Sequence, residues 1–211
     1  MNPAEFLGFY LLAPVQSKDK GRVGWWPQLG PDGRMIRPGL THPERDAERV
    51  GGHTTGVATL VMMAIHVPEL SDGLDMMRAM QMAIVHDMLG EWKDGDTNGH
   101  HTEPDKTRVQ GILEEKKRQE RADAEEACAP LPHHVREFYL ELWEEYNSGT
   151  SPEAKLVKQF DKLDFLLTGL FYLQSGEPVP LREEFLPNVR RKIKHPWLLE
   201  LVCEIERQLL H

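Results

Sequence analysis

The feature that most constrains this chain is a series of apolar residues spaced three and four positions apart, broken by glycine and proline. Between residues 48 and 66 this spacing predicts a helix with one buried face, which Pro68 ends. Residues 74–89 are apolar nearly all round, which is typical of a central helix. Further helices are predicted over about 105–128, 132–146, 152–167 and 196–210. No window shows strand alternation between turn signals, so we predict an all-α fold.

The chain of 211 residues is long enough to bury the core of one domain. We expect a single domain over residues 1–211, with its core at about 48–175. An N-terminal helix and loop would occupy 1–47, and a helical extension 176–211. The long loop is expected because residues 16–46 are rich in glycine, proline and charge and lack a sustained period.

Composition excludes several classes of protein. The net charge of −9 argues against broad nucleic-acid binding, which needs clustered Lys and Arg. No apolar run approaches the roughly 20 residues that span a bilayer. The apolar stretch 6–15 lacks the preceding basic residues and the cleavage site of a signal peptide, so a cytoplasmic location is the default expectation. Cys128 and Cys203 are too few for a disulfide framework or a zinc knuckle, and both are interpreted as structural thiols.

The residues that could carry chemistry are His53, His86, Asp87 and Asp161, which fall on three different predicted helices. Two imidazoles and two carboxylates suit one divalent ion such as manganese, cobalt, iron, nickel or zinc, with positions left open for water and substrate. An isolated histidine on an apolar helix face is more often a packed core residue than a ligand. Asp161, however, lies among inward-facing apolar positions, where an unpaired carboxylate would be costly unless a cation met it.

The sequence also resembles the HD-domain phosphohydrolases, and within them the 5′-deoxynucleotidase-like branch. The matching stretches keep the family's order and spacing, and they extend from residue 21 to residue 164, which spans about two-thirds of the chain. They are GRVGW (21–25), ERVGGH (48–53), AIVHDMLGEWKDGD (83–96) and LPHHVREFYLELWEEYNSGTSPEAKLVKQFDKLD (131–164).

The resemblance implies specific roles for several residues. His53, His86, Asp87 and Asp161 would coordinate one divalent metal. Glu91 and Asp96 would act in catalysis on the substrate side, and Arg22 and Trp25 would contact the nucleotide. The implied reaction is hydrolysis of a (deoxy)nucleoside 5′-monophosphate, and because family members often pair, a homodimer is expected.

The chain departs from the family pattern in three places. One residue is added between Asp87 and Gly90, which would turn Glu91 by about 100° if the helix continues. Gly52 stands where an acidic residue is common. The connector between Trp25 and Glu48 is longer than expected, and could form a lid that brings further charged residues to the phosphate; a solvated loop is the more frequent outcome. These residues are Arg34, Arg37, His42 and Arg45.

Several alternatives stay open at this point. The pairs His100–His101 and His133–His134 could hold a second metal, as some HD proteins do, although exposed or capping roles are more ordinary for them. The long connector and the extra histidines also permit a nucleoside triphosphate, a phosphodiester or a phosphonate as substrate. A catalytically weak nucleotide sensor with the same fold is the remaining alternative.

Overall fold

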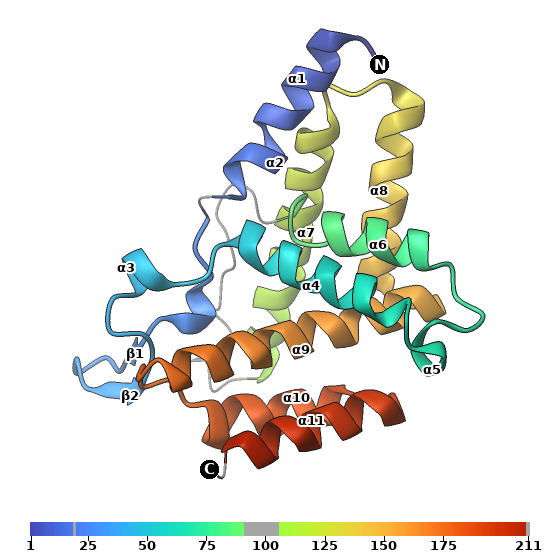
Figure 1. Ribbon diagram of the computed structural model, residues 1–211. Helices are drawn as coiled ribbons and strands as arrows, with labels where there is room; N and C mark the ends of the chain where they lie inside the picture. The colour runs from blue at the N-terminus through green and yellow to red at the C-terminus, as the bar shows by residue number, and fades with distance from the viewer. Residues whose placement is uncertain (19, 91–105, 210–211) are drawn as a thin grey trace.

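The computed structural model describes residues 1–18, 20–90 and 106–209, and helices dominate these segments (Figure 1). The predicted all-α class is therefore confirmed. The N-terminal part contains α1 (Pro3–Leu11), α2 (Ala13–Gln16), η1 (Val23–Trp25), β1 (Gln28–Leu29), β2 (Met35–Arg37) and α3 (Pro43–Asp46). The central part contains α4 (Val50–Ala64), α5 (Pro68–Ser71), α6 (Met76–Val85), α7 (Lys106–Cys128), α8 (His133–Ser148) and α9 (Pro152–Gln174). The C-terminal part contains η2 (Leu181–Phe185), α10 (Leu186–Lys192) and α11 (Pro196–Leu209).

Helix α9 lies at the centre of the molecule. Helices α4 and α6 pack against it and against each other, and α8 contacts both α6 and α9. Helices α10 and α11 cover the opposite side of α9 (Figure 1). The side chains that α9 buries are mainly apolar, with Asp161 and Asp164 as the two charged exceptions. The packing therefore brings residues of α4, α6 and α9 to one place around two buried carboxylates.

The ends of α8 and α9 follow from local sequence. Helix α8 stops at Gly149, whose φ of 63° lies in the left-handed region that favours glycine. The Ser151 hydroxyl then accepts a hydrogen bond from the backbone N–H of Ala154 at 3.1 Å, and Pro152 begins α9. The short Gly149–Ser151 connection fixes where α9 starts.

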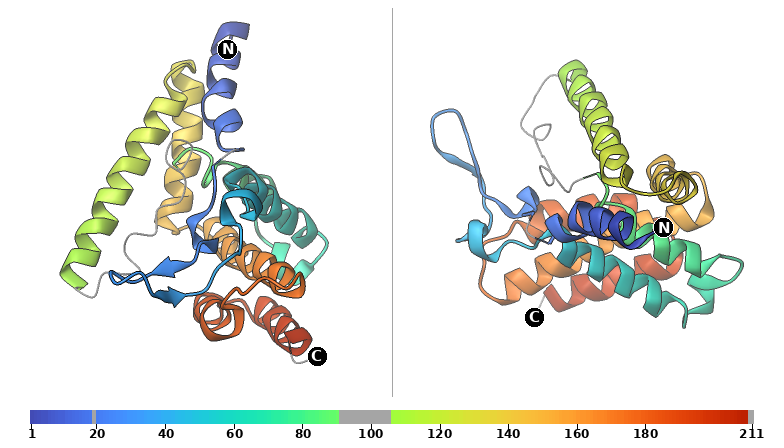
Figure 2. Two further views of the ribbon diagram at one scale, coloured as in Figure 1. Left: turned by 90° about the vertical axis from the view of Figure 1, so that its left-hand side faces the viewer. Right: turned by 90° about the horizontal axis from the view of Figure 1, so that it is seen from above.

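The segment predicted as a long loop contains short elements of regular secondary structure. Strands β1 and β2 form a small antiparallel hairpin that projects from the helical body (Figure 2). Its turn uses Gly33, with a φ of 76°, and the Gly30 N–H donates to the Arg34 carbonyl at 2.7 Å. Arg37 fastens the hairpin through a 2.8 Å bond from Nε to Glu184. The expectation of no strands is thus corrected, because two and three residues are too short to show alternation.

Within the described segments, no helix is long and apolar enough to cross a membrane.

Candidate metal centre

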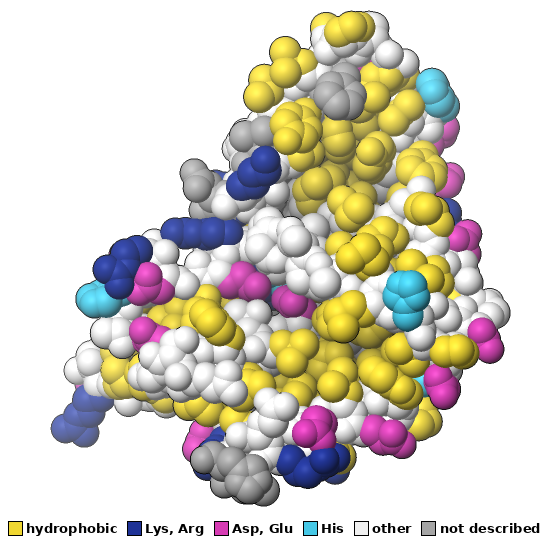
Figure 3. Space-filling model, viewed as in Figure 1, with side chains coloured by type: hydrophobic (Ala, Val, Ile, Leu, Met, Phe, Trp, Pro, Cys, Tyr) yellow, Lys and Arg dark blue, Asp and Glu magenta, His cyan; other side chains and the backbone are white. Residues whose placement is uncertain are grey.

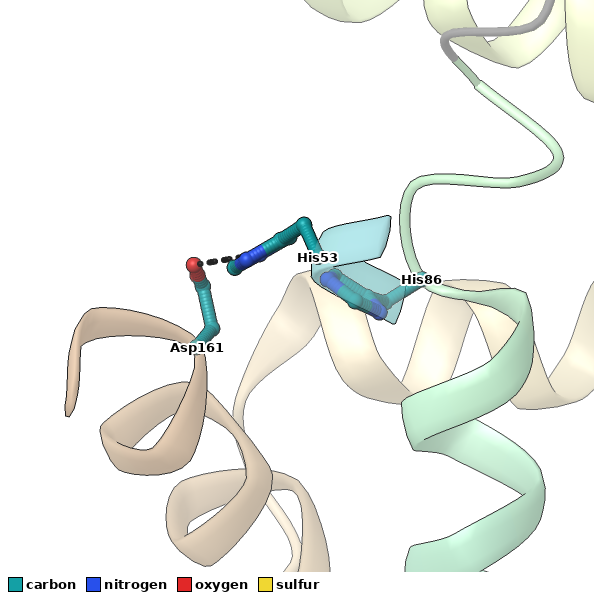
Figure 4. A group of neighbouring side chains, drawn as sticks. All are labelled: His53, His86 and Asp161. Atoms are coloured by element: carbon teal, nitrogen blue, oxygen red, sulfur yellow. Dashed lines mark ion pairs between the residues drawn. The ribbon is translucent and has the colours of Figure 1, made fainter. Parts of the chain in front are cut away.

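Three predicted ligands converge although they come from three helices. His53 lies on α4, His86 follows α6, and Asp161 lies on α9 (Figure 4). His53 Nε2 is 3.3 Å from Asp161 Oδ1, and the two imidazole rings are 5.3 Å apart. One ligand atom from each residue lies within 4.8 Å of the others. This is the spacing that donors around one shared ion would have.

Asp87, the fourth predicted ligand, faces the same point. Its Oδ2 lies 3.6 Å from His53 Nε2 and 3.4 Å from His86 Nε2. The same oxygen accepts a 2.9 Å bond from Nη1 of Arg22, a side chain that is 8% exposed. Arg22 therefore sits at the site, and it reaches Asp87 directly.

The hydrogen bonds of the two histidines fix which ring nitrogen faces the centre. His86 Nδ1 donates to the Ala83 carbonyl at 2.8 Å, and His53 Nδ1 lies 2.6 Å from Asp164 Oδ2. Both Nε2 atoms are buried and have no hydrogen-bond partner among the described residues. A ring held at Nδ1 by a carboxylate or a carbonyl offers its Nε2 lone pair to a metal. The donor set therefore fits a divalent ion.

The electrostatics of the cluster agree with a site for a cation. Burial and the charge of Arg22 lower the pKa of His53, but the neighbouring carboxylates of Asp161 and Asp164 outweigh them and raise it to about 9. Burial likewise opposes ionisation of Asp161, but neighbouring Lys162 and His53 hold the pKa of Asp161 well below its ordinary value. The buried Asp161 carboxylate thus stays charged and attracts positive charge.

A family model described as HD domain matches residues 34–195. The chain belongs to the HD-domain family. Its sequence is 30% identical to the 5′-deoxynucleotidase HDDC2 of Homo sapiens over 175 residues, which cover 83% of this chain and 79% of the relative. It is 32% identical to the protein of the same name from Danio rerio over 178 residues, 83% of this chain and 81% of the relative.

Solved structures share the fold of this HD domain. A conserved hypothetical protein from Pyrococcus furiosus superposes with a TM-score of 0.65 at 25% identity, covering 95% of this chain and 99% of that one. A protein from Magnetospirillum magnetotacticum, described as a predicted metal-dependent phosphohydrolase, has a TM-score of 0.62 at 20% identity, covering 97% and 95%. The resemblance noted in the sequence is confirmed.

A cavity of about 740 Å³ opens beside the metal centre of the HD domain. His86, Asp87 and Asp161 form part of its lining. Tyr146 of α8 also lines it, and the Tyr146 hydroxyl donates to Asp161 Oδ2 at 2.9 Å. Lys and Arg side chains from α9 and α10 also line it. A substrate in this cavity would therefore meet both the metal centre and several positive charges.

Trp25 is placed in the core and not beside a nucleotide. Its side chain has 0% exposure and stacks on Phe165 with ring centroids 4.4 Å apart. The rings of Tyr172 and Phe185 make T-shaped contacts with it, with centroids 5.0 and 5.6 Å away. Burying the large indole ring against other aromatic rings is favourable, which explains its place in the core. The structure thus corrects the expected nucleotide contact.

The predicted lid residues do not reach the cavity. Arg37 is bound to Glu184 and to backbone carbonyls, and Arg45 pairs with Asp46 at 2.8 Å. Arg34 and His42 do not line the cavity either, as far as the described residues define it. The solvated or structural loop is therefore the interpretation that the structure favours.

The remaining candidates divide into two groups. Glu91, Asp96, His100 and His101 lie outside the described residues, so their roles stay predictions. His133 and His134 are exposed at the start of α8, and neither belongs to a metal-ligating cluster within the described segments. His133 Nδ1 instead lies 2.9 Å from Glu137.

Two functional positions were missed in the sequence. Asp164 holds His53, and Gly56 leaves room for it, because a Cβ at Gly56 would lie 2.0 Å from Asp164 Oδ1. The signal for Asp164 was present: it lies three residues after Asp161 among apolar positions of the same helix. Nothing in the sequence alone indicated the close approach at Gly56.

Proposed function

We propose that this HD-domain protein is a metal-dependent phosphohydrolase that releases phosphate from (deoxy)nucleoside 5′-monophosphates. The main support is the convergence of His53, His86, Asp87 and Asp161 with two buried, unpartnered Nε2 atoms beside a cationic cavity. The similar proteins are named 5′-deoxynucleotidases, and this activity supplies the substrate class. The proposal thus combines a site that suits a metal with relatives that act on a nucleotide.

The four residues would hold one divalent metal. When bound, such an ion polarises a phosphoryl oxygen and acidifies a water molecule. Two nitrogens and two carboxylates are compatible with manganese, cobalt, iron, nickel or zinc.

The protein's own groups would orient the ligands and the phosphate. Asp164 and the Ala83 carbonyl keep the imidazoles of His53 and His86 turned toward the centre. Arg22 and Lys162 place positive charge next to Asp87 and Asp161, where they would offset the charge of a phosphate. Glu91 and Asp96 are proposed to position water and handle protons, on the strength of the family resemblance.

Homodimer formation in the cytoplasm is part of the same proposal. Figure 3 shows apolar side chains gathered over α1, α8, α6 and α4. Exposed members of these helices include Leu7, Tyr10, Leu11, Met62, Met63, Met77, Ile84 and Phe138. An apolar surface of this kind suits contact with another protein surface. The molar mass of the protein in solution, measured by light scattering, tests whether it forms a dimer.

The proposed activity is tested by phosphate release from ribo- and deoxyribonucleoside mono- and triphosphates. Metal-stripped protein would be resupplied separately with manganese, cobalt, iron, nickel or zinc. We expect release from 5′-monophosphates that depends on added metal. Turnover of triphosphates alone would reassign the substrate.

Substitution at the metal centre provides the second arm of this test. His86→Ala should abolish both metal binding and phosphate release, because it removes an Nε2 that faces the cluster. His66→Ala is the matched control, since His66 is an exposed histidine near the end of α4. Full turnover with bound metal in His86→Ala would refute the assignment of the centre.

A further inference from the structure

The cavity carries more positive charge than one phosphate requires. Six of its described lining side chains are Lys or Arg. Lys155, Lys158 and Lys162 come from α9, and Arg191, Lys192 and Lys194 come from α10 and the turn that follows it.

Among the described residues, few carboxylates neutralise these cations. Of the six, Lys162 pairs with a described carboxylate, since its Nζ lies 2.9 Å from Asp161 Oδ2. No described carboxylate lies within 4.0 Å of the side-chain nitrogen of Lys155 or Lys192. Glu120 is the one acidic lining residue outside the metal centre among those described. The wall formed by α9 and α10 is therefore strongly positive.

The other three cations have neutral partners. Lys158 Nζ lies 4.4 Å from the centre of the Tyr146 ring, and the Lys194 ammonium donates to the Arg191 carbonyl at 2.7 Å. The Arg191 guanidinium donates to Asn188. These contacts orient the side chains and leave their charge in place.

Hydrogen bonds connect the part of this wall that comes from α9 to the part that comes from α10 and the turn after it. The Gln159 side-chain oxygen accepts hydrogen bonds from the backbone N–H groups of Lys194 and His195, at 2.7 and 2.8 Å. One side chain of α9 thus holds the turn between α10 and α11. Burial and the nearby positive charge of Lys162 also lower the pKa of Lys192, in keeping with the proximity of cations from α9 and α10. Repelling charges held together favour an anion between them.

The extent of the wall exceeds one phosphate group. Lys155 precedes Asp161 by six residues, which corresponds to about 9 Å along the helix axis. A phosphate at the metal centre, with about two negative charges, would meet the metal, Arg22 and Lys162. Lys155, Lys192 and Arg191 would remain without an anionic partner among the described residues.

We infer that the α9–α10 wall binds a second phosphoryl group of the same substrate. The inference rests on the proposed function and extends it to nucleotides that carry two phosphoryl groups. Either a nucleoside 3′,5′-bisphosphate or a nucleoside 5′-diphosphate would supply the group, and the experiment separates these sources.

The test compares dAMP, dADP and deoxyadenosine 3′,5′-bisphosphate on the manganese-loaded full chain. We expect the KM of at least one two-phosphate nucleotide to lie about tenfold below that of dAMP. Lys155→Gln and Lys192→Gln should each reduce this advantage to about threefold or less, with little change in kcat for dAMP. A lower KM for the bisphosphate alone would mean that the wall binds a phosphate on the 3′ side of the sugar. A lower KM for dADP alone would mean that it binds the β-phosphate, which is joined to the first phosphate.

Arg190→Gln is the matched control. Arg190 is exposed on α10 beside Arg191, but it pairs with Glu206 of α11 and does not line the cavity. This variant should keep the full advantage. Equal KM values for one- and two-phosphate nucleotides, or an advantage unchanged in both lysine variants, would overturn the inference.

A failure of the proposed function would be recognised separately. If no nucleotide releases phosphate, the hydrolase proposal fails, and the same three nucleotides are compared by calorimetry as a ratio of Kd values. If a two-phosphate nucleotide binds more tightly than dAMP and the lysine variants lose this difference, the inference that the wall binds a second phosphoryl group is still supported. Equal affinities would overturn it.

Discussion

Gly56 matters at the scale of single residues because it gives Asp164 the room to hold His53. A Cβ at position 56 would approach Asp164 Oδ1 to 2.0 Å, so Gly56→Ala should displace the carboxylate from His53 Nδ1. Losing a partner that orients a metal-binding histidine typically weakens metal binding by about 10–100-fold. Competition with a chelator of known affinity measures this loss.

Gly52→Ala is the control on the same helix. A Cβ there meets nothing nearer than Glu48 Cγ at 3.5 Å, so metal affinity should be unchanged. Equal affinities for Gly56→Ala and Gly52→Ala would show that Asp164 does not govern the metal centre.

The two cysteines should differ in reactivity. Burial raises the pKa of Cys128 to about 12, so this thiol remains protonated at pH 8. Cys203 is partly exposed. We expect iodoacetamide at pH 8 to modify Cys203 and leave Cys128 intact in the native protein, as read by peptide mass spectrometry. Rapid labelling of Cys128 would contradict its buried position.

Residue-scale prediction from sequence was uneven for a physical reason. His53, His86, Asp87 and Asp161 were proposed as ligands because they combine two imidazoles with two carboxylates and because the sequence resembles the HD-domain family; for Asp161, the cost of an unpaired carboxylate among apolar positions added to the argument. Trp25 was misplaced because an indole ring can stack on a base or on the core, and its sequence neighbours do not distinguish the two. The close approach at Gly56 depends on the packing of α4 against α9, which no local pattern reports.

At the scale of elements, the start of α9 is a point where stability can be changed without altering the metal centre. Ser151→Ala removes the hydroxyl that accepts from the Ala154 N–H, and should lower the free energy of unfolding by about 1 kcal/mol. Urea denaturation measures the change. Metal affinity should stay the same, because Asp161 lies almost three turns further along the helix.

Ser175→Ala, just beyond the other end of α9, serves as the comparison. The Ser175 hydroxyl donates to the Phe171 carbonyl and caps no N–H group. Ser175→Ala should therefore lower the free energy of unfolding by less than Ser151→Ala does. Similar losses in both variants would argue against a specific capping contribution.

The helices were predictable and the hairpin was not. Helices α4, α6, α8 and α9 each span enough residues for the three- and four-residue spacing to emerge, and Ser151, Pro152 and Pro68 marked helix ends. Strands β1 and β2 are held instead by distant contacts such as Arg37 with Glu184, which are 147 positions apart. Contacts of that range leave no periodic trace in the sequence.

At the scale of the whole molecule, metal binding should be visible as thermal stability. Buried His53, His86 and Asp161 bind an ion only when the helices are assembled, so the folded state is stabilised by the ion. Free metal at about 100 times its Kd would add about 2.7 kcal/mol, or about 5–10 °C in Tm for a chain of this size. Differential scanning calorimetry with and without manganese measures the shift.

Asp161→Asn provides the comparison for this measurement. It keeps the shape of the side chain while removing its charge, so the metal-dependent rise in Tm should largely disappear. The same rise in both proteins would mean that the ion binds elsewhere.

The boundary expected after residue 175 coincides with a change of element but not with a division of the molecule. Phe185 packs against Trp25, and Leu181 comes so close to Gly169 that a Cβ there would lie 2.8 Å from it. The same segment contributes three of the six cations of the cavity. A chain cut after residue 175 would therefore uncover part of its buried tryptophan and lose three of the six cations that line the cavity, so this end serves both the core and the charge of the cavity.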